Sequence, residues 1–323
     1  METRITRSPR LAATILRDGG LVAFPTETVY GLGADARQAR AVESIFAAKG
    51  RPADNPLIVH IAGRTQLAQV AATVPPSAEA LLARFAPGPL TVIVPRHPDL
   101  PAVVTAGLDT VGVRIPNHPV ARAMLTAFAG PVAAPSANRS GRPSPTTWPA
   151  VAEELGGRVD AILQGGASAI GLESTVLDCT GEPPVILREG AITREALLAV
   201  WPQLADAVSP PPAEPVRSPG QKYRHYAPTA KVILVDHPQE VPARVAPTAA
   251  YIGLTHRGFV VKPQRVRRCR DIADYAQSLF RFFRACEKLG VRHIYCQRVP
   301  ETHMGRALMD RLRRAAGAEE GSQ

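Results

Sequence analysis

Short apolar runs alternate with stretches of helical periodicity through residues 1–200. Apolar runs of roughly four to eight residues bounded by Gly or Pro are typical of buried strands, whereas apolar residues repeated every three to four positions are typical of helices. The pattern predicts strands at 21–24, 57–61, 90–94, 111–116, 132–134, 159–163, 174–178 and 185–188. It predicts helices at 8–18, 38–48, 64–71, 77–86, 118–128, 148–155 and 193–200. Because strands and helices interleave, we expect an α/β layered fold for residues 1–205.

A cluster of prolines separates this region from a second one. Residues 206–230 are rich in proline, which favours an extended, semi-rigid linker. Residues 231–323 are expected to form a smaller α/β domain of Rossmann-like type, without the Gly-x-Gly-x-x-Gly dinucleotide fingerprint. Two domains agree with the chain length of 323, since a domain averages about 150 residues. The pattern in this region predicts strands at 232–235, 249–252 and 291–296 and helices at 272–289 and 304–316.

Composition restricts the class of protein. Hydrophobic residues make up 45% of the chain and charged residues 20%, which is ordinary for a folded globular protein. No apolar run approaches the roughly 20 residues that a membrane span requires, and no secretory signal follows the basic N-terminus. The four cysteines lack Cys-x-x-Cys spacing, so we interpret them as buried free thiols of a reducing compartment rather than a zinc site. These features predict a cytoplasmic protein that is not bound to a membrane.

The positive charge is concentrated near the C-terminus. The chain has a formal net charge of +10, of which residues 1–200 contribute +1 and residues 201–323 contribute +9. Such an excess can serve as a nucleic-acid or acidic-partner surface. An Arg-rich surface that is merely solvated is the favoured alternative, because no RNA-binding motif accompanies the charge.

Residues 24–61 combine elements that suit an anion. A predicted strand is followed by a polar segment with Gly31 and Gly33, which we interpret as a tight loop, then by a helix that Gly50 ends. Lys49 and Arg51 stand at the end of that helix, and Lys supplies a point charge where Arg supplies a bidentate fork. A phosphate pocket is one interpretation, and a solvated helix end that favours the helix dipole is the other.

Three motifs, spread over most of the chain, resemble those of one family. The first is Thr-Glu-Thr-Val-Tyr-Gly-Leu at 26–32 with Lys-x-Arg-Pro-x-x-Asn-Pro-Leu-x-x-His at 49–60, and the second is Ala-Pro-Ser-Ala-Asn at 134–138. The third, Ser-Pro-Gly-Gln-Lys-Tyr-Arg-His-Tyr-Ala-Pro at 218–228, lies in the proline-rich segment. Together they resemble the threonylcarbamoyl-AMP synthases in their long, two-domain form, with Gln221 where Met is usual. The resemblance implies a YrdC-like twisted open-sheet domain, a linker that covers the active site, and a C-terminal accessory domain.

The resemblance implies synthesis of L-threonylcarbamoyladenylate from L-threonine, bicarbonate or CO2, and ATP, with release of pyrophosphate. ATP is then a substrate, and Mg²⁺ is expected as its counter-ion, held mainly by phosphates rather than by protein side chains. The product would pass to the tRNA threonylcarbamoyltransferase machinery, whereas direct tRNA binding stays open.

The resemblance also implies roles for individual residues. Lys49 and Arg51 would be catalytic, because they would neutralise phosphate and the departing pyrophosphate. ATP contacts are implied for Arg51, Asn55, Thr110, Ser136, Asn138, Ser144, Arg188, Tyr223 and His225. L-threonine contacts are implied for Thr28, His60, Arg114, Ala134 and Ser174.

Plainer interpretations stand beside these roles. Ser136 and Asn138 also suit ordinary turns, Arg114 an exposed strand end, and His60 a core position. At the level of function, the alternatives are a carbamoyltransferase, like the related domain of hydrogenase-maturation proteins, and a non-catalytic RNA-binding module. The sequence shows neither the acylphosphatase nor the zinc-finger segments of those maturation proteins.

Overall fold

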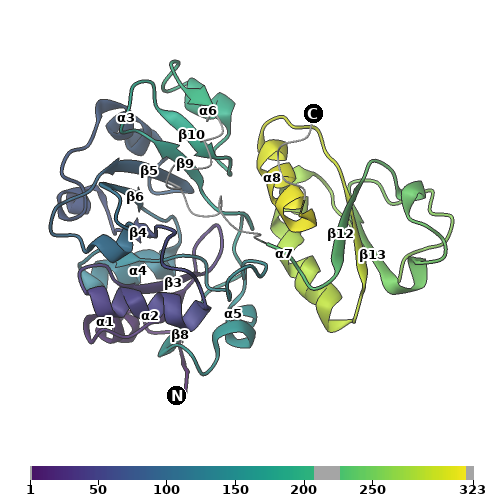
Figure 1. Cartoon of the computed structure of the whole chain (residues 1–323), viewed down its shortest axis with the longest axis horizontal. Coiled ribbons are helices and arrows are strands. Elements are labelled where there is room, and N and C mark those ends of the chain that lie inside the picture. Colours follow the sequence, from purple (N-terminus) through teal and green to yellow (C-terminus); the bar gives the residue numbers. More distant parts are fainter. Residues whose placement is uncertain (1, 207–225, 318–323) are drawn as a thin grey trace.

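The computed structural model describes residues 2–206 and 226–317. Figure 1 shows two α/β domains side by side, a larger one formed by residues 2–206 and a smaller one that begins in the green part of the chain. We call them the N-terminal and C-terminal domains. Most of the predicted linker, including Tyr223 and His225, lies outside the described residues.

An eleven-stranded mixed sheet forms the centre of the N-terminal domain, in the order β1-β8-β2-β3-β7-β4-β6-β5-β9-β10-β11. Parallel pairing of β4 with β6 places His60 directly beside Arg114 at the carboxyl ends of both strands. The strands are β1 (Arg4–Thr6), β2 (Val22–Phe24), β3 (Gly31–Asp35), β4 (Ile58–His60), β5 (Leu90–Pro95), β6 (Thr110–Arg114), β7 (Val132–Ala133), β8 (Ala161–Leu163), β9 (Thr175–Asp178), β10 (Val185–Arg188) and β11 (Ala205–Asp206).

Helices cover this sheet where the sequence pattern places them. The helix predicted at 38–48 is α2, and it ends at Gly50, whose left-handed backbone (φ 60°) suits a residue without a Cβ. The stretch predicted as a helix at 64–71 is instead a 3₁₀ helix. The helices are α1 (Pro9–Arg17), α2 (Ala39–Lys49), α3 (Pro76–Phe85), α4 (Pro119–Phe128), α5 (Trp148–Leu155) and α6 (Arg194–Leu198), with 3₁₀ turns η1 (Arg64–Gln69) and η2 (Ala102–Val104).

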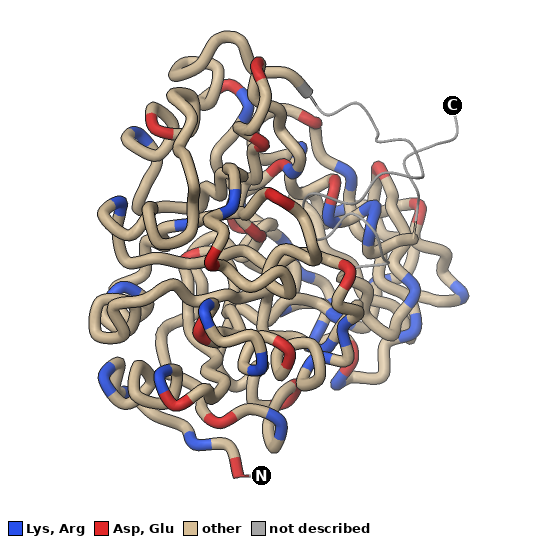
Figure 2. Tube along the Cα trace, turned by 60° about the vertical axis from the view of Figure 1, so that its left-hand side comes forward, with Lys and Arg blue, Asp and Glu red and all other residues tan. Residues whose placement is uncertain are grey.

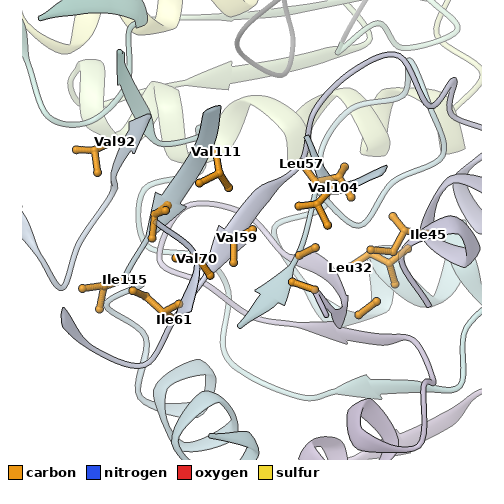
Figure 3. Close-up of a cluster of buried hydrophobic side chains, with 14 of the residues drawn as sticks. Leu32, Ile45, Leu57, Val59, Ile61, Val70, Val92, Val104, Val111 and Ile115 are labelled. Atoms are coloured by element: carbon orange, nitrogen blue, oxygen red, sulfur yellow. The ribbon is translucent and has the colours of Figure 1, made fainter. Parts of the chain in front are cut away.

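Apolar side chains of the sheet and of α2 share one core, part of which is drawn in Figure 3. Leu32 of β3 and Ile45 of α2 are fully buried in it, and so is Val59 of β4. Burial of a side chain of this size stabilises the fold by about 1.5–3 kcal/mol. The strands that end at the polar residues described below are therefore fixed by the core behind them.

Gly31 and Gly33 do not form the tight loop that the sequence predicts, because they lie in β3, which pairs antiparallel with β2. Close packing explains why glycine, rather than a larger residue, stands at position 33. A Cβ at Gly33 would stand 2.7 Å from Val132 and 2.9 Å from the Phe24 ring. Only residues 25–30 form the connection between β2 and β3, and this segment carries the polar side chains of the first motif.

The C-terminal domain has a four-stranded parallel sheet in the order β12-β15-β13-β14. The strand β14 is absent from the prediction, since three of its four residues are Arg and it shows no apolar pattern. The elements are β12 (Lys231–Val235), η3 (Pro238–Glu240), η4 (Ala246–Thr248), β13 (Ala249–Gly253), β14 (Arg265–Arg268), α7 (Ile272–Lys288), β15 (His293–Gln297) and α8 (Met304–Ala316).

Helices α7 and α8 lie between the small sheet and the N-terminal domain (Figure 1). Acidic and basic positions are interspersed along the trace in Figure 2, and several oppositely charged ones meet across the domain interface. Arg284 of α7 pairs with buried Glu154 of α5 at 2.9 Å, and Arg311 of α8 pairs with Glu173 at 2.9 Å. Val29 also packs into the apolar cluster of the C-terminal domain. The interface is therefore partly apolar and partly ionic.

All four cysteines are free and buried, as the sequence predicts. Burial raises the pKa of Cys179 to about 12 and that of Cys269 to about 11, so these thiols stay protonated at neutral pH. Within the described residues, none of the helices combines the length and the apolar character needed to cross a membrane.

The close packing around Gly33 predicts a loss of stability on substitution. Gly33→Ala should lower the free energy of unfolding by about 1–3 kcal/mol, because Val132 and Phe24 must move to admit the methyl group. Urea unfolding measures the change. The matched control is Gly181→Ala, at a position where a Cβ meets no heavy atom within 4 Å. Equal stability of the two variants would contradict this account of β3.

Candidate functional site

An open cavity, with about 670 Å³ of empty space when the solvent at its mouth is included, lies where β4, β6 and the β2–β3 connection meet. The segment after β7, the residues before β9 and the end of β10 form more of its wall, to which Arg51 and Tyr226 also contribute. Ten residues predicted from the sequence line it: Thr28, Arg51, His60, Arg114, Ala134, Ser136, Asn138, Ser144, Ser174 and Arg188. The folded chain therefore gathers residues that are up to 160 positions apart in sequence.

One corner of the cavity is built around Arg114, at the carboxyl end of β6. Its guanidinium donates to Glu27 Oε1 at 2.7 Å and to the Thr28 hydroxyl at 2.9 Å. Glu27 Oε2 accepts from the backbone N–H of Asn117. Only 4% of Arg114 is exposed. The interpretation of Arg114 as an exposed strand end is therefore wrong, and its side chain is held in a fixed, dry position that suits a carboxylate.

His60 lies beside this corner with 4% of its surface exposed. Burial lowers the pKa of the imidazole to about 3, and the positive charge of Arg114 adds to the shift. Its ring stands edge-on to Phe24 at 5.7 Å, and its Nδ1 has no hydrogen-bond partner among the described residues. His60 is therefore a neutral group at neutral pH, with a buried ring nitrogen that a ligand can engage.

The segment 135–138 forms a second part of the wall and runs antiparallel to the start of β3. The Ser136 hydroxyl donates to Asn138 Oδ1, and the Asn138 amide donates to the carbonyls of Arg139 and Arg142. These bonds fix the loop internally. Both residues are thus turn formers and cavity-lining residues at once.

Lys49 supports this segment from behind. Its ammonium donates to the carbonyl oxygens of Ser136 and Asn138, and 3% of the residue is exposed. Burial lowers the Lys49 pKa well below its usual range, and the charge of Arg51 lowers it further, whereas Glu154 raises it. Lys49 does not line the cavity, so in this conformation it cross-links the loop rather than facing a ligand.

Arg51 lines the cavity and is steadied by backbone carbonyls of residues 55 and 56. Asn55 and Thr110 do not line it. Asn55 is 1% exposed, and its buried Oδ1 has no partner among the described residues. Thr110 starts β6 and Arg114 ends it, so the two lie about 13 Å apart along the strand.

The remaining predicted residues form a connected polar wall. Ser174 shares a hydrogen bond with Thr91 at 2.8 Å, and Arg188 donates to the Ser174 hydroxyl at 3.1 Å and to its carbonyl at 3.0 Å. Ser144 donates to Glu173 Oε1 at 2.6 Å. Burial lowers the pKa of the Arg188 guanidinium, which nevertheless stays charged at neutral pH because its usual pKa is so high.

Several residues of the site are absent from the set predicted from the sequence: Glu27, Arg142, Glu173, Tyr226 and Arg311. Glu27 and Tyr226 fall inside the quoted motifs, so their position in sequence is a usable signal. Arg142, Glu173 and Arg311 carry no such signal, because their partners are distant in sequence.

The cavity wall suits a ligand that carries an anionic group and, apart from it, a carboxylate. Arg51, Arg142 and Arg188 all line the cavity and are only partly exposed, and cations that are partly withdrawn from water attract anions more strongly than fully solvated ones. No group of three or more His, Cys, Asp or Glu residues that could hold a metal occurs within 2–206 and 226–317. A metal here would depend on the ligand's own oxygens for most of its coordination.

The chain is similar to known proteins over most of its length. The Sua5_yciO_yrdC family model, described as "Telomere recombination", matches residues 14–190, and the Sua5_C model, described as "Threonylcarbamoyl-AMP synthase, C-terminal domain", matches residues 192–317. The threonylcarbamoyl-AMP synthase of Pyrococcus abyssi is 44% identical over 95% of this chain and 94% of its own length. That of Bacillus subtilis is 42% identical over 97% and 94%. The crystal structure of P. abyssi Sua5 complexed with L-threonine matches with a TM-score of 0.90 and 41% identity, over 98% of this chain and 97% of that one.

The contacts of Lys49 predict a structural cost when it is replaced. Lys49→Met should lower the free energy of unfolding by about 2 kcal/mol or more, because two carbonyls of the loop lose their buried donor. Thermal and urea unfolding of exposed Lys262→Met provide the comparison. If Lys49→Met is as stable as the control, the cross-linking role is wrong.

The buried imidazole predicts a pH-dependent stability. The folded-state pKa of His60, about 3, lies below the 6.5 of an exposed imidazole. Between pH 6.5 and 3 the unfolded chain binds a proton that the folded chain does not, so stability falls as the pH falls and is unaffected above this window. His60→Asn should remove about 2 kcal/mol of the stability difference between pH 7 and pH 5.

This prediction is checked by urea unfolding at several pH values. The control is the same replacement at exposed His237, which should leave the pH dependence of the wild type in place. An unaltered slope in His60→Asn would mean that the imidazole is protonated in the folded chain.

Proposed function

The chain belongs to the threonylcarbamoyl-AMP synthase family, and we propose that its cavity is where the reaction takes place. It is an enzyme that synthesises L-threonylcarbamoyladenylate, a nucleotidyl transfer that serves the modification of tRNA. One observation supports the assignment of the site to this cavity. The buried guanidinium of Arg114 suits a carboxylate, and the arginines that suit phosphates line the same cavity.

We propose a chemistry in which the substrates supply their own nucleophile. The threonine amine adds to CO2, formed from bicarbonate, and loses a proton, which gives a carbamate. A carbamate oxygen then attacks the α-phosphorus of ATP, and the bond from that phosphorus to the bridging oxygen breaks, so that pyrophosphate leaves. Catalysis then consists of positioning and of charge stabilisation.

L-threonine is assigned to the corner around Arg114. The guanidinium, already fixed by Glu27, would hold the substrate carboxylate, and Thr28 and Ser174 would accept or donate to its hydroxyl. His60 and Ala134 would complete this part of the wall. A site that pairs the hydroxyl would discriminate against valine, because an unpaired buried polar group costs about 1–3 kcal/mol.

ATP is assigned to the cationic wall. Arg51 and Arg188 would bind phosphate oxygens, together with Ser136 and Asn138, whose loop Lys49 supports. The orphaned Oδ1 of Asn55 would reach the nucleotide only after a local rearrangement. Ser144 lines the cavity and would also contact the nucleotide. The contacts of Thr110, Tyr223 and His225 are proposed on the family resemblance alone.

Mg²⁺ is proposed as a companion of ATP. Glu173 is the acidic residue among those lining the cavity, and its two oxygens already accept from Ser144 and Arg311. The residues present therefore fit a Mg²⁺ carried by the phosphates, where it would neutralise their charge.

We further propose the setting of this activity. The division into a catalytic domain at 1–205, a linker at 206–230 and an accessory domain at 231–323 follows the pattern of proline and apolar residues. The product would go to a tRNA threonylcarbamoyltransferase in the cytoplasm. We assign no direct contact with tRNA, and no observation on residues 2–206 and 226–317 favours the carbamoyltransferase or the RNA-binding alternative.

Release of pyrophosphate tests the proposal. With the wild-type protein, release from ATP should require both L-threonine and bicarbonate. Arg51→Ala should lower kcat/KM by about 100-fold or more, because a charge-stabilising donor is removed. The control variant is Arg64→Ala, an exposed residue of η1 that does not line the cavity.

Pyrophosphate release that continues without L-threonine would point to a different acceptor and would contradict the proposed reaction. Equal kinetics of the Arg51 and Arg64 variants would instead remove Arg51 from the site while leaving the reaction in place.

A further inference from the structure

Arg311 is a fully buried guanidinium that the C-terminal domain brings against the cavity wall. It belongs to α8, and none of its surface is exposed. It donates to Glu173 Oε2 at 2.9 Å and to the carbonyl of Glu189 at 2.9 Å, and it also pairs with Asp310. Two of these partners belong to the N-terminal domain.

The other oxygen of Glu173 faces a residue of the cavity. Glu173 Oε1 accepts the hydrogen of the Ser144 hydroxyl at 2.6 Å, and both residues line the cavity. An ionised carboxylate can only accept hydrogen bonds. Because the single hydrogen of Ser144 is committed to Glu173, the serine oxygen also has only lone pairs to offer. This part of the wall, Glu173 with Ser144, is therefore an acceptor pair.

An acceptor pair does not suit a phosphate. Phosphate oxygens are themselves negatively charged acceptors, so a carboxylate repels them. It suits a hydrogen-bond donor, and a nucleotide has such donors in its ribose hydroxyls and its adenine amine. We propose that Glu173 and Ser144 bind a donor group of the nucleotide, and that Arg311 is the positioning residue that pairs with Glu173 and holds it oriented for this. The inference rests on the proposed function, since it assumes that ATP enters this cavity.

The positioning role follows from burial. Glu173 is 7% exposed, and without Arg311 it would lose its ion-pair partner. The carboxylate would then lose the contact that fixes its orientation toward Ser144 and the cavity. Arg311 also lies 5.6 Å from the ring centre of Tyr226, which stacks on Phe280 and lines the cavity. The C-terminal domain thus shapes two neighbouring parts of the wall through one side chain.

Nucleotide analogues test which donor is bound. Binding of ATP, 2′-deoxy-ATP, 3′-deoxy-ATP and ITP to the full chain is measured by calorimetry, and pyrophosphate release is measured with each. The analogues lack one hydroxyl each or carry a carbonyl in place of the adenine amine. One of them should bind the wild type about tenfold or more weakly than ATP, as expected for a lost hydrogen bond to a charged group. In Glu173→Gln this preference should fall severalfold.

Arg311→Met tests the positioning role. It should raise the KM for ATP about tenfold, with a smaller change in kcat, and should reduce the same analogue preference, because Glu173 is no longer held in position to accept from the nucleotide. Arg313→Met on the same helix is the matched control, since that guanidinium pairs with Glu301 inside the C-terminal domain. If Arg311→Met fails to fold, Arg311→Lys is measured in its place, since it keeps Glu173 and a positive charge beside it but not the forked hydrogen bonds, and it should show the same loss of preference.

Equal binding of all four nucleotides by the wild type would overturn the acceptor pair. Reduced stability of Arg311→Met with an unchanged KM for ATP and an unchanged analogue preference would overturn the positioning role, because it would leave Arg311 as a docking residue only. The two failures differ from a failure of the proposed function, which would show as pyrophosphate release that does not depend on L-threonine and bicarbonate.

Discussion

Charged groups at this cavity have to be buried together with a partner, and that requirement shapes the protein as a whole. A lone charge taken from water into a protein interior costs several kcal/mol, so it needs an ion pair or several hydrogen bonds. Arg114 obtains them from Glu27 within the N-terminal domain. Glu173 obtains them from Arg311, which comes from the C-terminal domain. The two domains are therefore joined where the cavity wall carries charge.

This way of burying charge suits a reaction that needs positioning rather than a protein nucleophile. Arg114 is held by a carboxylate, and Arg51 by backbone carbonyls, before any ligand arrives. Donors fixed in advance need not reorganise as charge develops in the transition state. Lys49 acts indirectly in the same way, because it fixes the loop that holds Ser136 at the cavity.

The sequence predicts the structural features that depend on a local pattern and the site residues that the family resemblance implies. The helix that ends at Gly50 is an example of the first, and ten of the residues that line the cavity are examples of the second. Glycine suits both loops and close packing, so the sequence alone predicts a loop at Gly33. The pairing of β3 with β2 and the nearby Val132 and Phe24 side chains show that close packing is the reason here. The pair of Glu173 and Arg311 spans 138 positions and exists only in the folded chain, so neither residue carries a local signal.

The positive charge of the C-terminal domain gains a third interpretation from these contacts, beside solvation and the binding of an acidic partner. Arg284, Lys288 and Arg311 all pair with acidic residues of the N-terminal domain. Complementary charges of this kind select one relative orientation of two surfaces, because a shifted arrangement leaves buried charges unpaired. Undocking the C-terminal domain would remove the ion-pair partner of Glu173 in the cavity wall. Docking of the two domains therefore also determines how this carboxylate of the cavity is paired.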